Sequence, residues 1–257
     1  MDYVDLRRGN RTPAVGVLQK LLNRTGERLV VDGEFGAKTE AAVIRFQRQH
    51  RLAPDGIVGQ QTWPRIAAGA GLRIVDFIDI TDPDLDKMEA SDIAKAGGHP
   101  LVMGGVCNGV DQAVRMILVA APARSVFLLR FHGHGQAGMA GMGMGRDSFG
   151  WGERSDVDWA NLNKMRSVLA RLAPIFGPYG NVQFMHCETG SGPRGQATLK
   201  MVAEATGVPA TAGVHLQYGG GTDTFKFEGP TVTAIPGGGS LRSWCMARPE
   251  FAGMSMA

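Results

Sequence analysis

The chain of 257 residues is long enough for one large domain or two smaller ones, and its 44% hydrophobic and 20% charged residues are typical of a globular protein. A net charge of +3 is too small to indicate a nucleic-acid partner. No apolar run reaches the roughly 18 residues that a membrane span requires, so we expect no membrane-spanning segment.

Three short helices are expected near the N-terminus. Apolar residues at helical spacing predict a helix over residues 14–26, with Leu18 and Leu22 on one face. A second helix is expected over residues 39–50, and a third begins near Gln60. Together they predict a compact helical unit.

An internal repeat lies between these helices. The stretches DGEFGAKT, from Asp32, and DGIVGQQT, from Asp55, both read D-G-x-x-G-x-x-T. Asp and Gly supply turn conformations, including φ > 0 at glycine, and the later Gly and Thr let the chain enter the next helix closely. The pattern therefore predicts a turn followed by a helix start, twice.

This arrangement resembles the peptidoglycan-binding-domain-1 family. That family has an LQ in its first helix, a DG-x-FG-x-x-T turn, an AV-x-x-FQ helix and a closing DG-x-x-G-x-x-TW, and the sequence has each piece in that order within residues 5–67. The resemblance implies a non-catalytic domain, taken as residues 1–68, that binds the cell wall. Its core is expected to contain Leu18, Phe35, Val43, Phe46 and Trp63. The motif does not fix a ligand groove, so the wall-binding residues are unknown.

Strands and helices alternate after a small, glycine-rich linker at residues 69–73. Strands are expected over 74–80, 125–131, 181–186 and 209–216, and helices over 109–121, 158–176 and 194–207. This order predicts an α/β domain with a mostly parallel sheet and helices on both faces. The domain is taken as residues 74–257, with a hairpin turning at 228–230 and a tail from Gly237.

A histidine and a cysteine follow two of the expected strands. His134 lies just past the strand at 125–131, and Cys187 lies just past the strand at 181–186. The carboxyl ends of parallel strands share one edge of a sheet, where ligand sites lie, so we expect the two side chains to meet. A thiolate is a strong nucleophile, and a nearby imidazole removes the proton of the thiol. Glycines after both residues would leave room for a substrate and free N–H groups for an oxyanion.

The same stretches resemble the caspase-like cysteine peptidases, the clan that contains metacaspases, legumains and gingipains. There the catalytic His follows a strand in a GHG or HG motif, and the catalytic Cys follows the next strand, often as C-x-x-G. LLRFHGHG and FMHCETGSG match both motifs in order, and the resemblance covers roughly residues 74–220. It implies Cys187 as nucleophile, His134 as general base and Gly135 near the oxyanion site.

Several alternatives stay open at this site. His132 is an equally placed base, because alternation along a strand points it to the same side as His134. Glu188, directly after the cysteine, is a further polar residue of that loop. His-x-His also suits a metal, but no carboxylate stands at a recognisable spacing, so neither a metal nor another cofactor is expected. Cys107 and Cys245 have no histidine partner and are expected to be structural.

These patterns predict a cell-wall-associated cysteine hydrolase, a peptidase or amidase with a Cys-His dyad, anchored to peptidoglycan or to a wall-associated protein. The alternative is a non-catalytic binding or structural component of a phage-like or secretion assembly that keeps a caspase-like fold. The start, MDYVDLRRGN, has no classical signal peptide. We therefore expect a protein that is cytoplasmic as made and reaches the wall or periplasm by a non-classical route or an injection apparatus.

Overall fold

The computed structural model describes residues 5–79, 83–103, 109–142 and 156–253. The chain forms two compact units. One contains the residues up to Arg73 together with those from Gly239 onward, and the other is Ile74–Gly238. Cys107 lies outside the described residues, as does most of the glycine- and methionine-containing stretch that follows His134.

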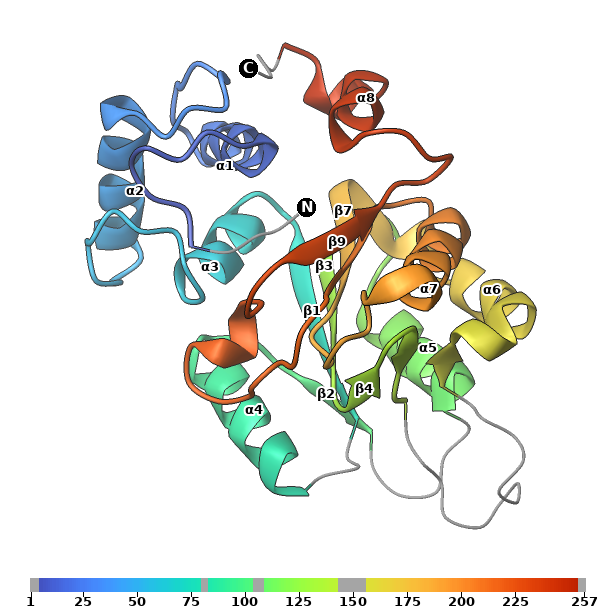
Figure 1. The fold of residues 1–257 in the computed structure, drawn as a ribbon. Helices are drawn as coiled ribbons and strands as arrows, with labels where there is room; N and C mark the ends of the chain where they lie inside the picture. The colour runs from blue at the N-terminus through green and yellow to red at the C-terminus, as the bar shows by residue number, and fades with distance from the viewer. Residues whose placement is uncertain (1–4, 80–82, 104–108, 143–155, 254–257) are drawn as a thin grey trace. The chain divides into compact units, whose positions relative to one another are not determined.

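Three helices make up the N-terminal part of the first unit (Figure 1). They are α1 Pro13–Arg24, α2 Ala37–Gln49 and α3 Thr62–Gly69. The side chain of Thr12 caps α1 by accepting a hydrogen bond from a backbone N–H of the first turn, and a proline follows at a position that needs no donor. The buried core of these helices includes Leu18, Leu22, Phe35, Val43, Phe46 and Trp63. The helical N-terminal region expected from the sequence is confirmed.

A buried glutamine of α1 holds the first repeated turn. Gln19 Nε2 donates to Asp32 Oδ1 at 2.7 Å, to the Glu34 carbonyl at 3.0 Å and to Thr39 Oγ1 at 3.1 Å. Gln19 Oε1 accepts from the N–H of Gly33 at 3.0 Å. Gly33 has φ +74°, a conformation that glycine adopts without steric cost. One side chain therefore satisfies the turn and joins it to two helices.

Gln47 of α2 does the same for the second repeated turn. Its Nε2 donates to Asp55 Oδ1 at 2.8 Å, to the Ile57 carbonyl at 2.9 Å and to Thr62 Oγ1 at 3.3 Å. Its Oε1 accepts from the N–H of Gly56 at 2.9 Å, and Gly56 has φ +75°. The repeat in the sequence is thus a repeat of hydrogen bonds around a buried amide.

The last described residues belong to the first unit, although the sequence analysis counted them with the α/β domain. They form α8 Leu241–Met246 and the 3-10 helix η5 Pro249–Phe251. Lys20 of α1 donates to the carbonyl of Ala252 at 2.6 Å. Within the segment, the rings of Trp244 and Phe251 meet edge to face, with centroids 5.7 Å apart. The described part of the expected tail therefore contains a short helical segment.

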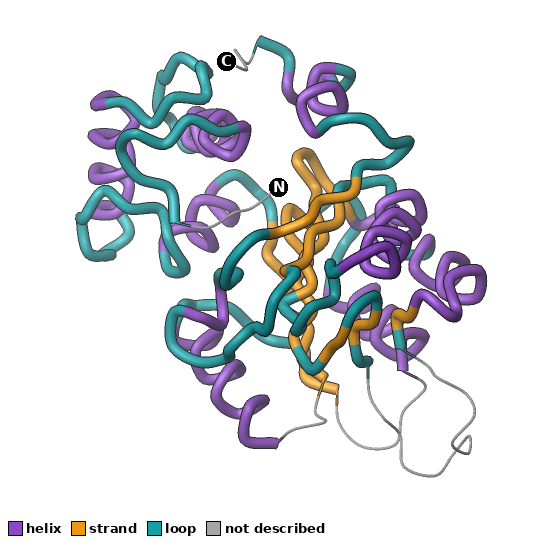
Figure 2. The backbone as a smooth tube through the Cα atoms, in the orientation of Figure 1, coloured by secondary structure: helices purple, strands orange, loops and turns teal. Residues whose placement is uncertain are grey.

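A six-stranded sheet forms the centre of the second unit (Figure 2). Its strands are β1 Arg73–Asp79, β2 Leu101–Met103, β3 Val126–His132, β7 Phe176–Phe184, β8 Ala210–Gly213 and β9 Thr231–Ala234. Their order across the sheet is β2-β1-β3-β7-β8-β9. The pairs β1–β2, β3–β7 and β7–β8 are parallel, and only β9 is shown to run antiparallel, to β8. The expected α/β domain with a mostly parallel sheet is confirmed.

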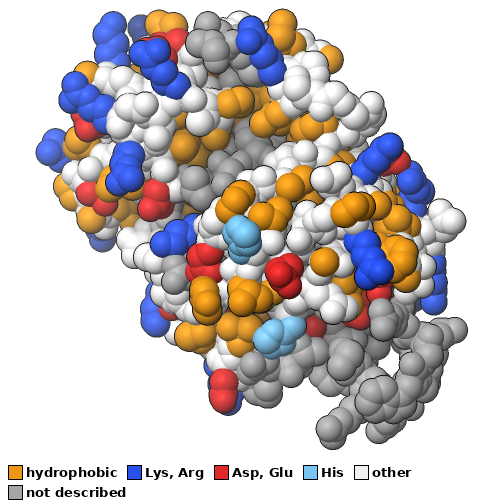
Figure 3. Space-filling view, viewed as in Figure 1, with side chains coloured by type: hydrophobic (Ala, Val, Ile, Leu, Met, Phe, Trp, Pro, Cys, Tyr) orange, Lys and Arg blue, Asp and Glu red, His pale blue; other side chains and the backbone are white. Residues whose placement is uncertain are grey.

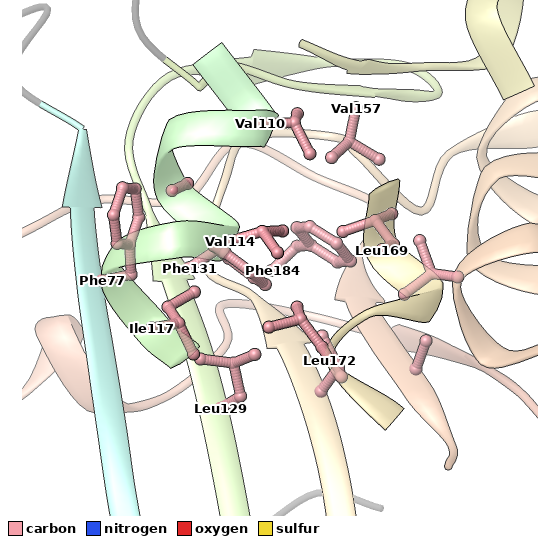
Figure 4. Close-up of a cluster of buried hydrophobic side chains, with 14 of the residues drawn as sticks. Phe77, Val110, Val114, Ile117, Leu129, Phe131, Val157, Leu169, Leu172 and Phe184 are labelled. Carbon is pink, nitrogen blue, oxygen red and sulfur yellow. The ribbon is translucent and has the colours of Figure 1, made fainter. Parts of the chain in front are cut away.

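Helices pack on both faces of this sheet. They are α4 Pro83–Lys95, α5 Gly109–Ala120, α6 Leu162–Ala170 and α7 Gly192–Thr206. The larger core lies between the sheet and α5, α6 and α7; Figure 4 shows Val114, Leu169 and Phe184 converging there. Phe77 of β1 belongs to this core, whereas its neighbour Ile78 packs with Ile93 of α4. Adjacent strand residues face opposite sides, so α4 covers the other face.

Two expected elements differ in the structure. The hairpin expected at 228–230 is absent, because Asp223–Phe225 forms a 3-10 helix and β9 pairs with β8 instead. The long helix expected over 158–176 is broken into η2 Trp159–Asn161, α6 and η3 Ala173–Ile175. A proline at the start of η3 cannot continue an α-helix, and the chain enters β7 directly afterwards.

A small second sheet follows β3. Its strands are β4 Gly135–Gln136, β5 Met139–Ala140 and β6 Val157–Asp158, paired antiparallel in that order. The first residues after His134 therefore form a tight hairpin. Among the helices of the described ranges, none is long and apolar enough to cross a membrane.

Candidate functional site

The ends of β3 and β7 bring the histidine and cysteine segments together. The two strands pair in parallel up to Phe131 and Phe184, so the residues that follow leave the sheet at the same edge. Gly135 packs so closely on the next segment that an added Cβ would lie 2.9 Å from the carbonyl oxygen of Cys187. The glycine after His134 therefore permits a close backbone approach to Cys187, where the sequence analysis expected open space for a substrate.

Thr189 ties the β4–β5 hairpin to the cysteine loop. Its Oγ1 donates to the carbonyl of Met139 at 2.9 Å, and its own carbonyl accepts from the N–H of Gly138 at 3.2 Å. The hairpin is closed next to the sheet by a bond from the N–H of Gly141 to the carbonyl of His134 at 2.9 Å. These bonds fix the backbone of the two segments relative to each other.

Cys187 is half-buried and lies against the backbone of Gln217. The N–H of Gln217 donates to Cys187 Sγ at 3.3 Å, and the thiol donates to the Gln217 carbonyl at 3.4 Å. The Gln217 side chain is itself held by the backbone of Glu228, with bonds of 2.9 and 3.2 Å. Leu216 and Tyr218, on either side of Gln217, are exposed. The sulfur therefore lies beside a well-anchored loop with apolar side chains at the surface.

His132 and His134 lie in different environments, which corrects the expectation that both point to the same side. β3 ends at His132, and Gly133 follows with φ +150°, so strand alternation stops there. His132 is fully buried, whereas His134 is exposed. Figure 3 shows histidine side chains at the surface of the second unit among hydrophobic and acidic ones. His134 is the one of the two that solvent and a substrate can reach.

His132 instead belongs to a buried group of charges. Its Nε2 lies 3.1 Å from Asp76 Oδ1, and its Nδ1 lies 3.8 Å from Glu89 Oε1. Arg130, two residues earlier on β3, binds the same aspartate through Nε at 2.5 Å and Nη2 at 3.1 Å. Arg130 also stacks over Phe225, with 5.0 Å from Cζ to the ring centroid. These buried charged side chains connect β1, β3 and α4 near the end of β3.

Burial and charge act in opposite directions on these groups. Burial alone raises the pKa of Asp76, but the charge of Arg130 and the bonds to His132 and Arg130 hold it well below its usual range. Burial alone lowers the pKa of His132, but the Asp76 and Glu89 carboxylates outweigh it, and the pKa of His132 is raised. The ionised forms of both groups are therefore favoured inside the protein.

His186 is a second buried histidine with the opposite behaviour. Burial lowers the pKa of His186 to about 3, so its ring is neutral at pH 7. Its Nε2 lies 3.2 Å from the carbonyl oxygen of Gly141, which only accepts, so Nε2 carries the hydrogen. The ring packs close to Gly133, where an added Cβ would lie 3.2 Å from Nε2. His186, just after β7, thus binds the end of the β4–β5 hairpin through this hydrogen bond.

Two backbone N–H groups of the cysteine loop, including that of an expected oxyanion donor, Gly190, are already engaged. The N–H of Glu188 donates to the carbonyl of His215 at 2.9 Å, and the N–H of Gly190 donates to the carbonyl of Gly213 at 2.9 Å. Glu188 has φ +53°, a left-handed conformation that is uncommon for a residue other than glycine. Such outliers occur often at functional sites, and this one directly follows Cys187.

The other cysteine of the described residues is unlike Cys187. Cys245 of α8 is fully buried, and burial raises the pKa of its thiol to about 11. No group of three or more His, Cys, Asp or Glu residues suited to a metal ion occurs within the part of the chain that the structure describes.

The motifs did not predict Asp76 and Glu89 as neighbours of His132, or Gln217 as the neighbour of Cys187. Asp76 and Arg130 carried a signal, because each is a charged residue inside an apolar strand, in IVDFIDI and FLLRFH. α4, which supplies Glu89, also carried one, with a proline at its start, two aspartates in the first turn and a lysine in the last. Gln217 had no signal, because only its backbone contacts the sulfur.

Comparison with known proteins identifies the family of the three N-terminal helices. Residues 11–66 match the family described as "Putative peptidoglycan binding domain". This part of the chain is therefore a peptidoglycan-binding domain, as its repeated turns and glutamines indicate. The match covers less than a quarter of the chain and includes neither candidate residue.

Two curated relatives match short stretches. Zinc D-Ala-D-Ala carboxypeptidase of Streptomyces albus G is 52% identical over 42 residues, which are 16% of this chain and 16% of that protein. An uncharacterized protein in the bpoA1 3' region of Kitasatospora aureofaciens is 58% identical over 36 residues, 14% of this chain and 30% of that protein. The chain thus spans less than a third of the length of either relative.

Two solved structures also show similarity. A peptidoglycan-binding protein from Clostridioides difficile, in complex with glutamine hydroxamate, is 37% identical over 24% of this chain and 39% of that chain, with a TM-score of 0.24. The Burkholderia AP3 phage endolysin is 28% identical over 48% of this chain and 40% of that chain, with a TM-score of 0.26. Scores this low do not establish a shared overall fold.

Proposed function

We propose that this protein is a cell-wall-associated hydrolase that cleaves amide bonds at Cys187, with His134 as general base. The peptidoglycan-binding domain at residues 11–66 supports a place of action at the wall. A relative over a short stretch is named as a D-Ala-D-Ala carboxypeptidase, which agrees with hydrolysis in that setting.

One observation carries the catalytic part of the proposal. β3 and β7 are adjacent and parallel, and the residue after His134 packs against the carbonyl of Cys187. A histidine that solvent reaches and a half-buried cysteine therefore follow neighbouring strands at one edge of the sheet. The same order, His after one strand and Cys after the next, supports the proposed relationship to caspase-like peptidases.

The chemistry follows from these two groups. His134 accepts the proton of the Cys187 thiol as the sulfur attacks the carbonyl carbon of an amide. The proton then passes to the leaving amine, the C–N bond breaks and a thioester remains on Cys187. Water, deprotonated by His134, hydrolyses the thioester and restores the thiol. His132 is buried on Asp76 and is not the proposed base.

Thiol modification tests this proposal. The full-length protein is treated with iodoacetamide near neutral pH, each cysteine is followed by peptide mass mapping, and hydrolysis is measured on labelled sacculi and on a mixed peptide library. We expect activity to disappear in step with alkylation of Cys187, with Cys245 unmodified because it is buried. Full activity after complete alkylation of Cys187 would contradict the proposal.

The wall-binding part is tested separately by co-sedimentation with purified sacculi. The Cys187→Ala variant is expected to sediment like the wild type, because the anchor lies in the other unit. Sacculus binding without any hydrolysis by the wild type would favour the rival function, a non-catalytic component of a phage-like or secretion assembly.

A further inference from the structure

The loop that contacts Cys187 is hydrogen-bonded to α4. This Gln217 loop, residues 215–224, follows β8 and places the backbone of Gln217 on the sulfur. Further along it, the N–H of Gly221 donates to Asp92 Oδ2 of α4 at 2.6 Å. Thr224 Oγ1 donates to the same oxygen at 3.3 Å. α4 therefore anchors the far end of the loop, while Glu228 holds Gln217 itself.

Glu89 lies directly beneath the same loop. A Cβ added to Gly219 would lie 3.0 Å from Glu89 Oε1, so the loop backbone packs on this carboxylate. Glu89 is buried, and its Oε2 has no hydrogen-bond partner. A buried carboxylate with so few hydrogen bonds is destabilising unless a positive charge lies nearby. His132 Nδ1, 3.8 Å from Glu89 Oε1, supplies it.

His132 therefore connects the two halves of the site. It lies two residues before His134 on β3, and it also contacts Glu89 on the helix that carries the Gln217 loop. Its other nitrogen is held by Asp76 of β1. Nε2 is within hydrogen-bond distance of Asp76, whereas Nδ1 has no hydrogen-bond partner and lies at ion-pair distance from Glu89. Two carboxylates around one ring favour the positively charged imidazolium.

We propose that His132 is a positioning residue: as an imidazolium it joins Asp76 to Glu89, and through α4 it holds the Gln217 loop against Cys187. Its importance for catalysis rests on the function proposed above, whereas the positioning itself is a property of the fold.

The positioning depends on pH through the charges around His132. The buried charged or titratable groups on the surrounding elements are Asp76 and Asp79 from β1, Asp86 and Glu89 from α4, Arg130 from β3 and His186 after β7. Neighbouring carboxylates raise the pKa of His132, which favours the imidazolium. When the pH rises through that raised pKa, Glu89 loses its counter-charge inside the protein. The contact between α4 and the loop then weakens.

Hydrogen exchange of the full-length protein tests this proposal. Protection of the peptides covering residues 215–224, corrected for intrinsic exchange rates, is measured from about pH 6 to about pH 9, a range that begins near the ordinary histidine pKa and extends above it. In the wild type we expect protection to fall about tenfold, which corresponds to about 1.4 kcal/mol of lost interaction. In Glu89→Gln the corrected protection stays constant, because a neutral amide needs no counter-charge.

The matched control is Glu204→Gln, which removes an exposed ion pair with Arg166 of 2.9 Å and should retain the wild-type pH dependence. The protonation state of His132 is read independently from its ring ¹⁵N shifts. A neutral ring at pH 7, or equal pH dependence in the wild type and in Glu89→Gln, would overturn the proposal. Neither readout requires hydrolysis, so inactivity of the protein would refute the proposed function and leave the positioning role intact.

Discussion

Replacing Asp76 by alanine should destabilise the α/β unit strongly. The carboxylate is 3% exposed and receives two hydrogen bonds from Arg130 and one from His132. Removing one partner of such a buried pair leaves the other charges uncompensated and typically costs about 3–5 kcal/mol. For a domain of this size, each kcal/mol shifts the melting temperature by about 2–4 °C, so we expect the melting temperature of the unit to fall by about 6–20 °C.

The effect should also depend on pH in a defined direction. Neighbouring cations hold the pKa of Asp76 well below its usual range. Its stabilising contribution is therefore complete above the pKa of an unfolded aspartate and is lost as the pH falls through the folded value. The difference between wild type and Asp76→Ala should shrink in acid.

Differential scanning calorimetry of the full-length protein measures both effects, with Asp111→Ala as the matched control. Asp111 also binds two arginines, Arg115 at 2.7 Å and Arg171 at 2.5 Å, but its side chain is 30% exposed. Exposed ion pairs contribute only about 0.2–1 kcal/mol each. If Asp76→Ala were no more destabilising than Asp111→Ala, the buried group of charges would not stabilise the unit as we reason.

Two further predictions concern the other buried polar groups. Gln47→Ala should lower the stability of the first unit by about 2–4 kcal/mol, because it removes four hydrogen bonds and leaves buried groups unsatisfied. Gln19→Ala should have the same effect. Urea unfolding, followed by hydrogen exchange of residues 12–70, measures the loss, and unchanged exchange would contradict the prediction. The pKa of His186 is lowered to about 3 in the folded protein. The α/β unit should therefore lose stability as the pH falls below the pKa of an unfolded histidine, by about 1.4 kcal/mol per pH unit until the pH reaches the folded pKa. In calorimetry between about pH 6 and pH 4, His186→Gln should lose this part of the acid sensitivity, and an unchanged pH dependence would argue against a neutral buried ring.

The first unit could be predicted from local signals. Its two D-G-x-x-G-x-x-T turns have positive φ at Gly33 and Gly56, as the repeat requires. The apolar positions chosen from helical spacing, such as Leu18 and Phe46, are buried. The role of Gln19 and Gln47 could not be predicted from the sequence. A buried glutamine that hydrogen-bonds a turn is recognisable only when the structure of the turn is known.

The α/β unit was predictable in outline but not around the candidate site. α4 escaped detection because two of its acids, Asp86 and Glu89, face the interior and break the amphipathic pattern. The two histidines separate because Gly133 ends the strand, a conformation that spacing alone does not reveal. The partner of β9 is β8, about twenty residues earlier, and no local turn signal favours such a pairing over a hairpin.

The most direct test of the central claim is the rate at which Cys187→Ala hydrolyses labelled sacculi and peptides, relative to wild type with the same amount of protein bound to sacculi. If the sulfur of Cys187 forms the covalent intermediate, the rate falls by at least about a thousandfold, while Cys245→Ala keeps a rate close to that of the wild type. Hydrolysis by Cys187→Ala at a rate near that of the wild type would contradict a cysteine mechanism at this edge of the sheet.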